Sequence, residues 1–289
     1  MKLNFNSFSK ALAIGAGLFL FSACEKDQVV TPGDRSLETR SPNITDMPRK
    51  IPFLGLTSSN EIIWLTTGNS ASDQGAIAIS GLNSNEQILA IDFRPASGQL
   101  YGISNHNKLY TIHTNTGLAT AVSSAHFSPA INGAMVGFDF NPTVDRIRVV
   151  TSAEQNLRLH PVTGQVVFVD GAINPGDLNL AAAAYINSFA GATSTLLYTI
   201  DFMEGKLYKQ NPPNNGTQEE IGSLGIHETG DGGFDISPDN SVALAVVNGD
   251  PESPGKKSNF FFINLESGKA TPAGVSKRNI IGVAIPPQQ

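Results

Sequence analysis

One short phrase recurs along this chain about every 48 residues. The phrase is Asp-Phe-x-Pro, in which an apolar segment ends at an acidic residue and a turn-forming proline. It begins at Asp92 and Asp139, and related phrases begin at Tyr185, Asp235 and Ala284. A period of roughly 20 to 50 residues is typical of folds built from repeated units, such as solenoids and propellers. The repeat therefore constrains the fold more strongly than any single motif.

Each repeat contains four short segments of strand-forming residues. The phrase ends the first strand, and second strands are predicted at 100–103, 147–150 and 197–200. Third strands are predicted at 108–112, 156–159 and 206–208, and a glycine-containing turn then leads to a fourth. Four short strands separated by turn signals are typical of one propeller blade. Helical periodicity is missing from the repeats, so we predict an all-β fold.

The two ends of the repeat region complete each other. Residues 280–286 form a first strand with no second strand after it, whereas 52–56, 61–66 and 76–80 form three strands with no first strand before them. Joining these fragments makes one whole blade and pairs both free sheet edges. Residues 50–289 then hold five repeats, which predicts a five-bladed β-propeller of four-stranded blades. The C-terminal strand closes its last blade together with the N-terminal strands.

The first 23 residues have the pattern of an export signal. Lys2 and Lys10 precede or flank an apolar stretch over 11–21, which is followed by Ser22, Ala23 and Cys24, the only cysteine in the chain. A cysteine after small residues resembles a bacterial lipobox. The resemblance implies that residues 1–23 are a lipoprotein signal peptide and that Cys24 carries a lipid. The alternative is an ordinary secretory signal with an incidental cysteine.

Residues 24–49 are polar, contain proline and show no apolar periodicity, as a flexible tether does. With a lipid on Cys24, this tether predicts a domain held at the membrane of the cell envelope, in an outer-membrane, periplasmic or surface-facing position. The net charge is −6 and lysine and arginine are scattered along the chain. Both observations argue against a nucleic-acid partner, since phosphate contacts need clustered cations.

Several segments resemble a known family. They are 92–102, 139–149, 155–158, 210–216 and 233–236, and the likeness extends in order over roughly residues 50–286. These segments are similar to the family called domain of unknown function 4394. The resemblance implies a secreted or surface-attached bacterial propeller, and it implies no activity.

The second repeat carries arginines where the other repeats carry aromatic residues. Arg148 lies in its second strand and Arg158 in its third. The matching positions elsewhere hold Tyr101 and Tyr198 in second strands, and Trp64, Tyr110, Tyr208 and Phe261 or Phe262 in third strands. A turn centred near Ala153 places the two arginines opposite each other, where like charges repel.

Something must offset that repulsion. The candidates are Asp139, Asp145, a tyrosine of a neighbouring blade or a bound anion. Strand alternation adds Arg146 on the face of Arg148, and Asn156 on the face of Arg158. Two interpretations stay open: a structural salt-bridge and cation–π cluster between blades, or a binding site for an anion or polyol.

The acidic residue of the repeated phrase allows a second site. Asp92, Asp139 and Asp235 could ring the central channel and hold a cation, for which carboxylate oxygens suit Ca²⁺. Alternatively, each aspartate caps its own proline-containing turn. Tyr185 and Ala284 fill the other two positions, so a symmetric five-residue ring is excluded. No other cofactor is predicted.

A polar, proline-stiffened loop lies at 210–216, between a third and a fourth strand. Loops carry recognition more often than strands do, so Gln210 and Asn214 are candidate binding residues. A plain rigid turn is the alternative. Among the five histidines, His106 and His227 are expected in loops.

Two functions follow from these patterns. The first is a non-catalytic binding or scaffold module, anchored at the envelope, for a glycan, peptide or protein partner. The alternative is a metal-dependent hydrolase or lactonase-like enzyme with Asp139, Asn187, Asp235 and the arginines at the channel mouth. The sequence contains neither His-Glu-x-x-His nor Gly-x-Ser-x-Gly, so no catalytic residue is nominated.

Overall fold

The computed structural model describes residues 50–68, 75–226, 230–248 and 258–287, which all belong to the compact unit Thr39–Gln289. The predicted signal peptide, Cys24, the tether up to residue 49 and His227 lie outside the described residues. The one helix in the described ranges is a 3-10 turn, η1 (Pro213–Asn215). None of the described helical structure is therefore long and apolar enough to cross a membrane.

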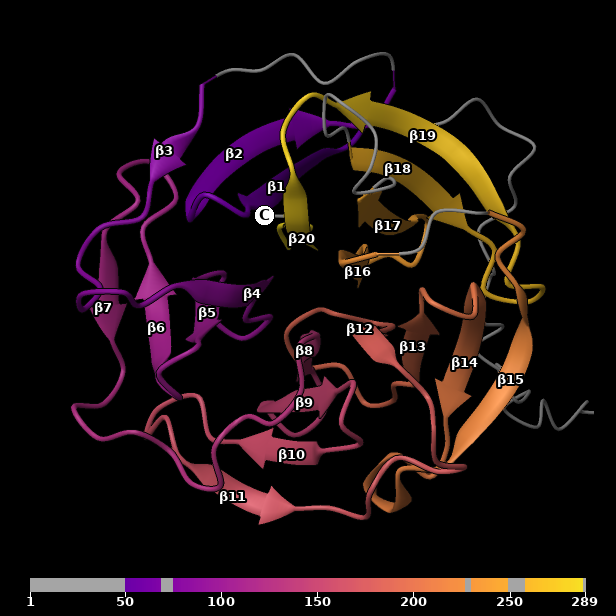
Figure 1. Cartoon of the computed structure of the whole chain (residues 1–289), viewed down its shortest axis with the longest axis horizontal. Helices are drawn as coiled ribbons and strands as arrows, with labels where there is room; N and C mark the ends of the chain where they lie inside the picture. The colour runs from indigo at the N-terminus through magenta and orange to yellow at the C-terminus, as the bar shows by residue number, and fades with distance from the viewer. Residues whose placement is uncertain (1–49, 69–74, 227–229, 249–257, 288–289) are drawn as a thin grey trace, which may run out of the picture. The chain divides into compact units, whose positions relative to one another are not determined.

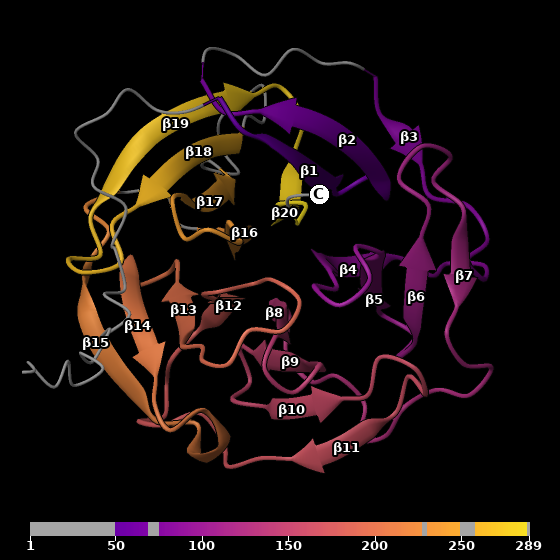
Figure 2. The same ribbon diagram turned by 180° about the vertical axis from the view of Figure 1, so that it is seen from behind.

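Twenty strands form five four-stranded antiparallel sheets, arranged as blades around a central channel (Figure 1). The view from behind shows the same ring (Figure 2). Blade 1 comprises β4 (Ile88–Phe93), β5 (Leu100–Ser104), β6 (Leu109–Ile112) and β7 (Ala119–Ala121). Blade 2 comprises β8 (Val136–Asn141), β9 (Arg146–Thr151), β10 (Asn156–Leu159) and β11 (Val166–Val169). The five-bladed propeller predicted from the repeat is confirmed.

Blades 3 and 4 follow the same order from the channel outward. Blade 3 comprises β12 (Leu180–Tyr185), β13 (Leu197–Asp201), β14 (Lys206–Gln210) and β15 (Gln218–Ser223). Blade 4 comprises β16 (Gly232–Ile236), β17 (Ala243–Asn248), β18 (Ser258–Ile263) and β19 (Ala270–Ser276).

Blade 5 closes the ring with both ends of the described chain. The C-terminal β20 (Ile280–Ala284) is its innermost strand and pairs with the N-terminal β1 (Pro52–Thr57). The sheet continues through β2 (Glu61–Thr66) to β3 (Ile77–Ala78). The predicted closure is confirmed, and it pairs the innermost edge that the N-terminal strands would otherwise expose.

The strand register aligns the blades row by row. The predicted opposition of Arg148 and Arg158 in blade 2 is confirmed, and Asp139 lies opposite Arg148 in the same row. Its counterparts are Asp92–Tyr101–Thr111, Ala184–Tyr198–Lys209, Asp235–Leu244–Phe262 and Ala284–Leu54–Trp64.

Three residues were therefore aligned wrongly by one position. Ala184, not Tyr185, occupies the aspartate position of blade 3. Tyr110 pairs with Gly102 and Tyr208 with Thr199, so neither tyrosine matches Arg158. A one-residue slip moves a side chain to the opposite face of the sheet.

The hydrophobic core lies between neighbouring blades rather than at the centre of the ring. One cluster joins blades 3 and 4 through Ala184, Phe202 and Phe234, for example. Small residues let the innermost strands approach closely: a Cβ on Gly137 would meet the Ala183 nitrogen at 2.9 Å. A small cavity remains in the channel, lined by residues of the innermost strands such as Ala182 and Gly233.

Candidate functional site

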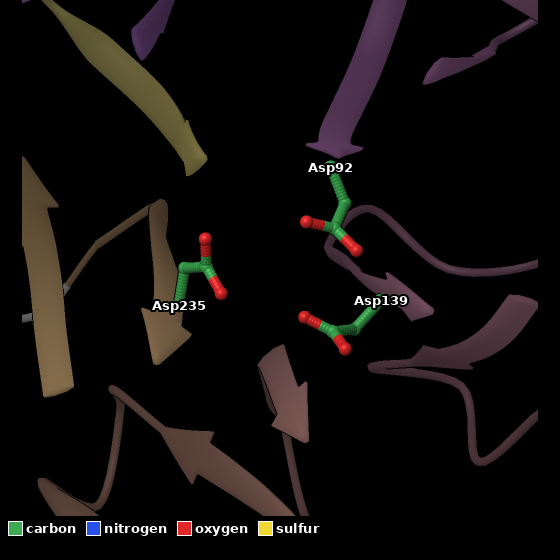
Figure 3. Close-up of side chains that lie close together, drawn as sticks. All are labelled: Asp92, Asp139 and Asp235. Atoms are coloured by element: carbon green, nitrogen blue, oxygen red, sulfur yellow. The ribbon is translucent and has the colours of Figure 1, made fainter. Parts of the chain in front are cut away.

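Three aspartates converge where the innermost strands end at the channel (Figure 3). Asp92 comes from β4, Asp139 from β8 and Asp235 from β16, and all three are buried. One carboxylate oxygen of each lies within 4.8 Å of the others. The structure thus brings together the three acidic residues that the repeat singled out.

Each aspartate bonds to the innermost strand of the next blade. The Phe140 N–H donates to Asp92 Oδ2 at 2.8 Å, and the Tyr185 N–H donates to Asp139 Oδ1 at 3.2 Å. The Ile285 N–H donates in the same way to Asp235 Oδ2. The side chain of each aspartate therefore joins its own blade to the next blade, at the edge of the channel.

In blades 1 and 4, the equivalent backbone N–H group has no aspartate in the preceding blade to accept its hydrogen bond. Ala284 and Ala184 precede blades 1 and 4, and there the N–H groups of Phe93 and Ile236 donate to their own neighbours, Asp92 Oδ1 and Asp235 Oδ1, at 2.6 Å. Three carboxylates thus accept all five equivalent backbone N–H groups around the channel, as buried donors require. The predicted capping of the proline turn was wrong, because these bonds stay within and between the innermost strands.

Burial and mutual repulsion raise the pKa of these acids. Desolvation raises the pKa of Asp92 and Asp139 well above the usual range, and the nearby carboxylates raise it further. Burial raises the pKa of Asp235 to about 7. No described residue donates to the second oxygen of Asp139. The cluster can relieve its repulsion by holding protons or by holding a cation, and its oxygen donors suit Ca²⁺ or Mg²⁺.

Arg148 is enclosed between blades 2 and 3, with 1% of its surface exposed. Its Nη1 donates to Asn156 Oδ1 and to Asp170 Oδ2, both at 2.6 Å. Its Nη2 donates to Asn214 Oδ1 at 2.8 Å, and its Nε donates to the Tyr185 hydroxyl at 3.3 Å. Four donor bonds are made to protein groups, which favours the structural interpretation of this cluster.

Asp170 offsets the repulsion between the two arginines. Its carboxylate accepts two bonds from Arg158, at 2.7 and 2.8 Å, besides the bond from Arg148. The Arg158 guanidinium also lies 4.0 Å from the centre of the Phe168 ring, at cation–π distance. The two acidic candidates, Asp139 and Asp145, were wrong, whereas a tyrosine of the neighbouring blade, Tyr185, does contact Arg148 through its hydroxyl.

The 210–216 loop is part of the same network. Asn156 Nδ2 donates to the Pro213 carbonyl at 3.0 Å, and Gln210 Nε2 donates to that carbonyl at 2.6 Å. Gln218 in turn donates to Gln210 Oε1 at 2.8 Å. The candidate residues Gln210 and Asn214 therefore connect the loop to blade 2 and to its own blade. We call the set of Arg148, Asn156, Arg158, Asp170, Gln210 and Asn214 the blade 2–3 network.

The remaining candidates lie apart from this network. Arg94 forms a bidentate ion pair with Asp145, between blades 1 and 2. Arg146 donates to the Val144 and Asp145 carbonyls of its own turn. Asn187 in blade 3 exchanges two bonds with the Asn240 side chain in blade 4, at 2.7 and 2.6 Å.

His106 lies beside a different buried acid. Its Nδ1 is 3.8 Å from Glu86, whose carboxylate also accepts hydrogen bonds from Ser104 and Tyr110. The Ser104 hydroxyl donates to the glutamate and not to the histidine, so the three do not form a nucleophile–base pair.

Sequence reasoning missed Asp170 and Phe168, and it considered a tyrosine of a neighbouring blade without identifying it as Tyr185. Asp170 directly follows the outermost strand of blade 2, and Phe168 lies within that strand. Both residues could have been predicted from the pairing of the fourth strand with the third, because this pairing places Phe168 opposite Arg158 and Asp170 two residues further along the chain.

Comparisons with known proteins give a family and a distant structural likeness. No protein of curated function matches the chain. A structural genomics protein of unknown function from Bacteroides thetaiotaomicron aligns with a TM-score of 0.43 and 12% identity, over 82% of this chain and 68% of that one. The family model described as Domain of unknown function (DUF4394) matches residues 62–284, in agreement with the resemblance seen in the repeats. The chain therefore belongs to the DUF4394 family.

Proposed function

We propose that this protein is an envelope-anchored lipoprotein whose propeller is a non-catalytic binding or scaffold module for a glycan, peptide or protein partner. The observation that carries the proposal is that the candidate site residues form hydrogen bonds with other residues of the fold. Arg148 has 1% of its surface exposed, and its guanidinium donates hydrogen bonds to Asn156, Asp170 and Asn214 of the blade 2–3 network. Support for the anchor comes from the sequence around Cys24.

A recognition surface is available on the loop between β12 and β13. This loop exposes 45% of Phe189 and 36% of Leu196, which are large apolar side chains. The bonds between Asn187 and Asn240 hold the start of the loop against blade 4. A positioned loop with exposed apolar side chains is suited to bind a partner, since rigid scaffolds commonly present recognition loops.

The anchor is tested by fractionating cells that express the wild-type chain or Cys24→Ala. The wild-type protein is expected in the membrane fraction with a lipid on its N-terminal peptide, measured by mass spectrometry. Cys24→Ala is expected to lose the lipid and leave that fraction. A wild-type chain without lipid contradicts the anchor.

Recognition is tested with glycan and peptide arrays probed by the wild-type protein, Phe189→Ser and Met203→Ser. Met203 is the control because it is 52% exposed on a different connection of the same blade. Phe189→Ser is expected to lose binding while its melting temperature stays unchanged, and Met203→Ser is expected to bind normally. Equal binding by all three proteins rules out the loop.

The alternative proposal is a metal-dependent hydrolase or lactonase-like enzyme, and the aspartate cluster favours it. Three buried carboxylates within 4.8 Å supply the oxygen set of a hard cation. Elemental analysis of the purified protein tests this. About one divalent cation per chain is expected in the wild type and in Asp145→Asn, but not in Asp139→Asn. No cation in the wild type, together with no thermal shift on adding Ca²⁺ or Zn²⁺, contradicts the enzyme.

A further inference from the structure

The outermost strand of blade 2 exposes an unusual run of apolar side chains. In β11, Val167 is 38% exposed, Phe168 53% and Val169 65%. Val162, in the turn that leads to this strand, is 61% exposed. β11 is also the free edge of its sheet, because the strand order is β11-β10-β9-β8. An exposed apolar edge strand is a template for pairing with another strand.

The other outer strands in the described part of the chain carry protective features. β15 contains Glu219 and Glu220, each paired with a lysine of β14. β19 contains Pro272, which lacks an N–H group. β3 and β7 have two and three residues. Charges, prolines and very short strands are among the usual devices against edge-to-edge pairing, and β11, with four residues, contains neither a charge nor a proline.

The backbone of β11 favours a strand as partner over a lipid surface. The Asp170 N–H donates to the Asn156 carbonyl, and Val169 lies next to that pair, opposite Leu157. By the alternation of an antiparallel ladder, the N–H and C=O of Val169 point away from β10. A membrane interior would leave these polar groups without partners, whereas another strand satisfies them.

We propose that β11 pairs with β11 of a second copy of this chain, antiparallel and related by a two-fold axis. Charge selects this edge. Two copies with a net charge of −6 repel each other, but residues 161–169 contain no charged side chain. Pairing β15 with itself would bring its glutamates together, whereas a two-fold pairing centred on Val169 opposes Val169 to Val169 and Phe168 to Asp170, whose carboxylate already accepts bonds from Arg148 and Arg158.

The charges behind the strand are already balanced. Arg158 lies against Phe168, and Asp170 accepts bonds from both Arg158 and Arg148. A β-bulge between Arg158 and Leu159 shifts the register at Val167, which keeps the regular part of the edge short. The resulting dimer is weak and concentration-dependent. This inference goes beyond the proposed envelope function and holds with or without a lipid on Cys24.

Sedimentation equilibrium of the purified full chain over a range of concentrations tests the dimer. Val169→Lys places a cation at the centre of the pairing and is expected to weaken dimerisation by about tenfold or more. Val275→Lys is the matched control, because Val275 is 42% exposed on the outer strand of blade 4. The control is expected to dimerise normally. A monomer at all concentrations, or equal weakening by both variants, overturns the proposal.

Cysteine crosslinking locates the contact. Val169→Cys is expected to give a crosslinked pair of identical chains under mild oxidation, and Val275→Cys is not. A Val169→Cys adduct of a different mass, to another protein, would overturn the second copy as the occupant. Equal crosslinking at both positions would overturn β11 as the interface.

Discussion

The two junctions of blade 3 differ in how they are built. On the side of blade 2, Arg148 and Asp170 form a buried ion pair within the blade 2–3 network, and Asp139 accepts the Tyr185 N–H. On the side of blade 4, Ala184 replaces the aspartate, and small alanines pack against Phe202 and Phe234. A side-chain pair, Asn187 with Asn240, contributes polar bonds there, besides a backbone bond from the Ala270 N–H to the Leu224 carbonyl.

The comparison shows that one ring can join its blades by two kinds of chemistry. Apolar packing is non-directional and tolerates small changes in geometry. A buried arginine with four donor bonds is satisfied in one arrangement only, so it fixes how blade 2 and blade 3 meet. We infer that the polar junction determines register and the apolar junction contributes burial.

Removing the centre of the polar junction is expected to have the largest effect. Arg148→Met removes a partner from Asn156 and from the Asp170 carboxylate, whose exposed fractions are 1% and 7%, which costs roughly 3–5 kcal/mol of unfolding free energy. Chemical denaturation measures it. Arg146→Met, two residues away on the same strand, is the control, because in the described part of the chain Arg146 donates to carbonyls of its own turn. It should change stability by less than about 0.5 kcal/mol.

The channel aspartates predict an unusual pH dependence. An unfolded aspartate titrates near pH 4, whereas the pKa of folded Asp235 is about 7. The folded state therefore holds an extra proton between these values, and stability falls as pH rises through that window, by roughly 2–4 kcal/mol. Denaturation at pH 4 to 8 in chelator measures the slope.

The control for this slope is Asp139→Asn. It removes one of the three repelling carboxylates but keeps an oxygen that can accept the Tyr185 N–H. The fall in stability should then be smaller. Stability that instead rises steadily from pH 4 to 7 in the wild type would show that these acids are ionised in the folded protein.

Adding an acid to the apolar junction is expected to destabilise it moderately. The carboxyl of Ala184→Asp would face blade 4, where the Ile236 N–H already donates to Asp235. An unsatisfied buried polar group costs about 1–3 kcal/mol, and more as pH rises and the carboxyl ionises. Thermal melts of Ala184→Asp and the smaller Ala184→Ser at two pH values measure this. An unchanged melting temperature would show that this junction accepts polarity.

The asparagine pair of the apolar junction is expected to contribute least. Asn240 has a φ of 58°, so Asn240→Gly removes the side chain without backbone strain. The loss should be about 1 kcal/mol. Asn85→Gly, at a φ of 61°, is the matched control and should be close to neutral. A larger loss in the control than in Asn240→Gly would contradict the role of the pair.

The fold could be predicted because its signals are local and repeated. The unpaired strand at 280–286 required a partner, and the N-terminal strands lacked an innermost one, so closure followed from edge pairing. The register of blade 3 could not be predicted in the same way. Its first strand reads Leu-Ala-Ala-Ala-Ala-Tyr, with no acid to align, and Tyr185 took the place of Ala184.

The opposition of Arg148 and Arg158 followed from a single hairpin, and it was confirmed. Their partners were harder to predict, since Asn214 comes from blade 3, 66 residues along the chain. Asp170 is nearer in sequence, but it follows the fourth strand of the blade and reaches both arginines only through the folded sheet. Contacts of this kind depend on how blades turn toward each other, which the repeat does not encode.

The most direct test of the polar junction is a double-mutant cycle between Arg148→Met and Asn214→Ala, measured by denaturant unfolding. These residues belong to different blades and meet at 2.8 Å. If the network joins the blades, the two changes should be coupled by about 1 kcal/mol or more. Additive effects, within about 0.3 kcal/mol, would contradict a structural connection between blades 2 and 3.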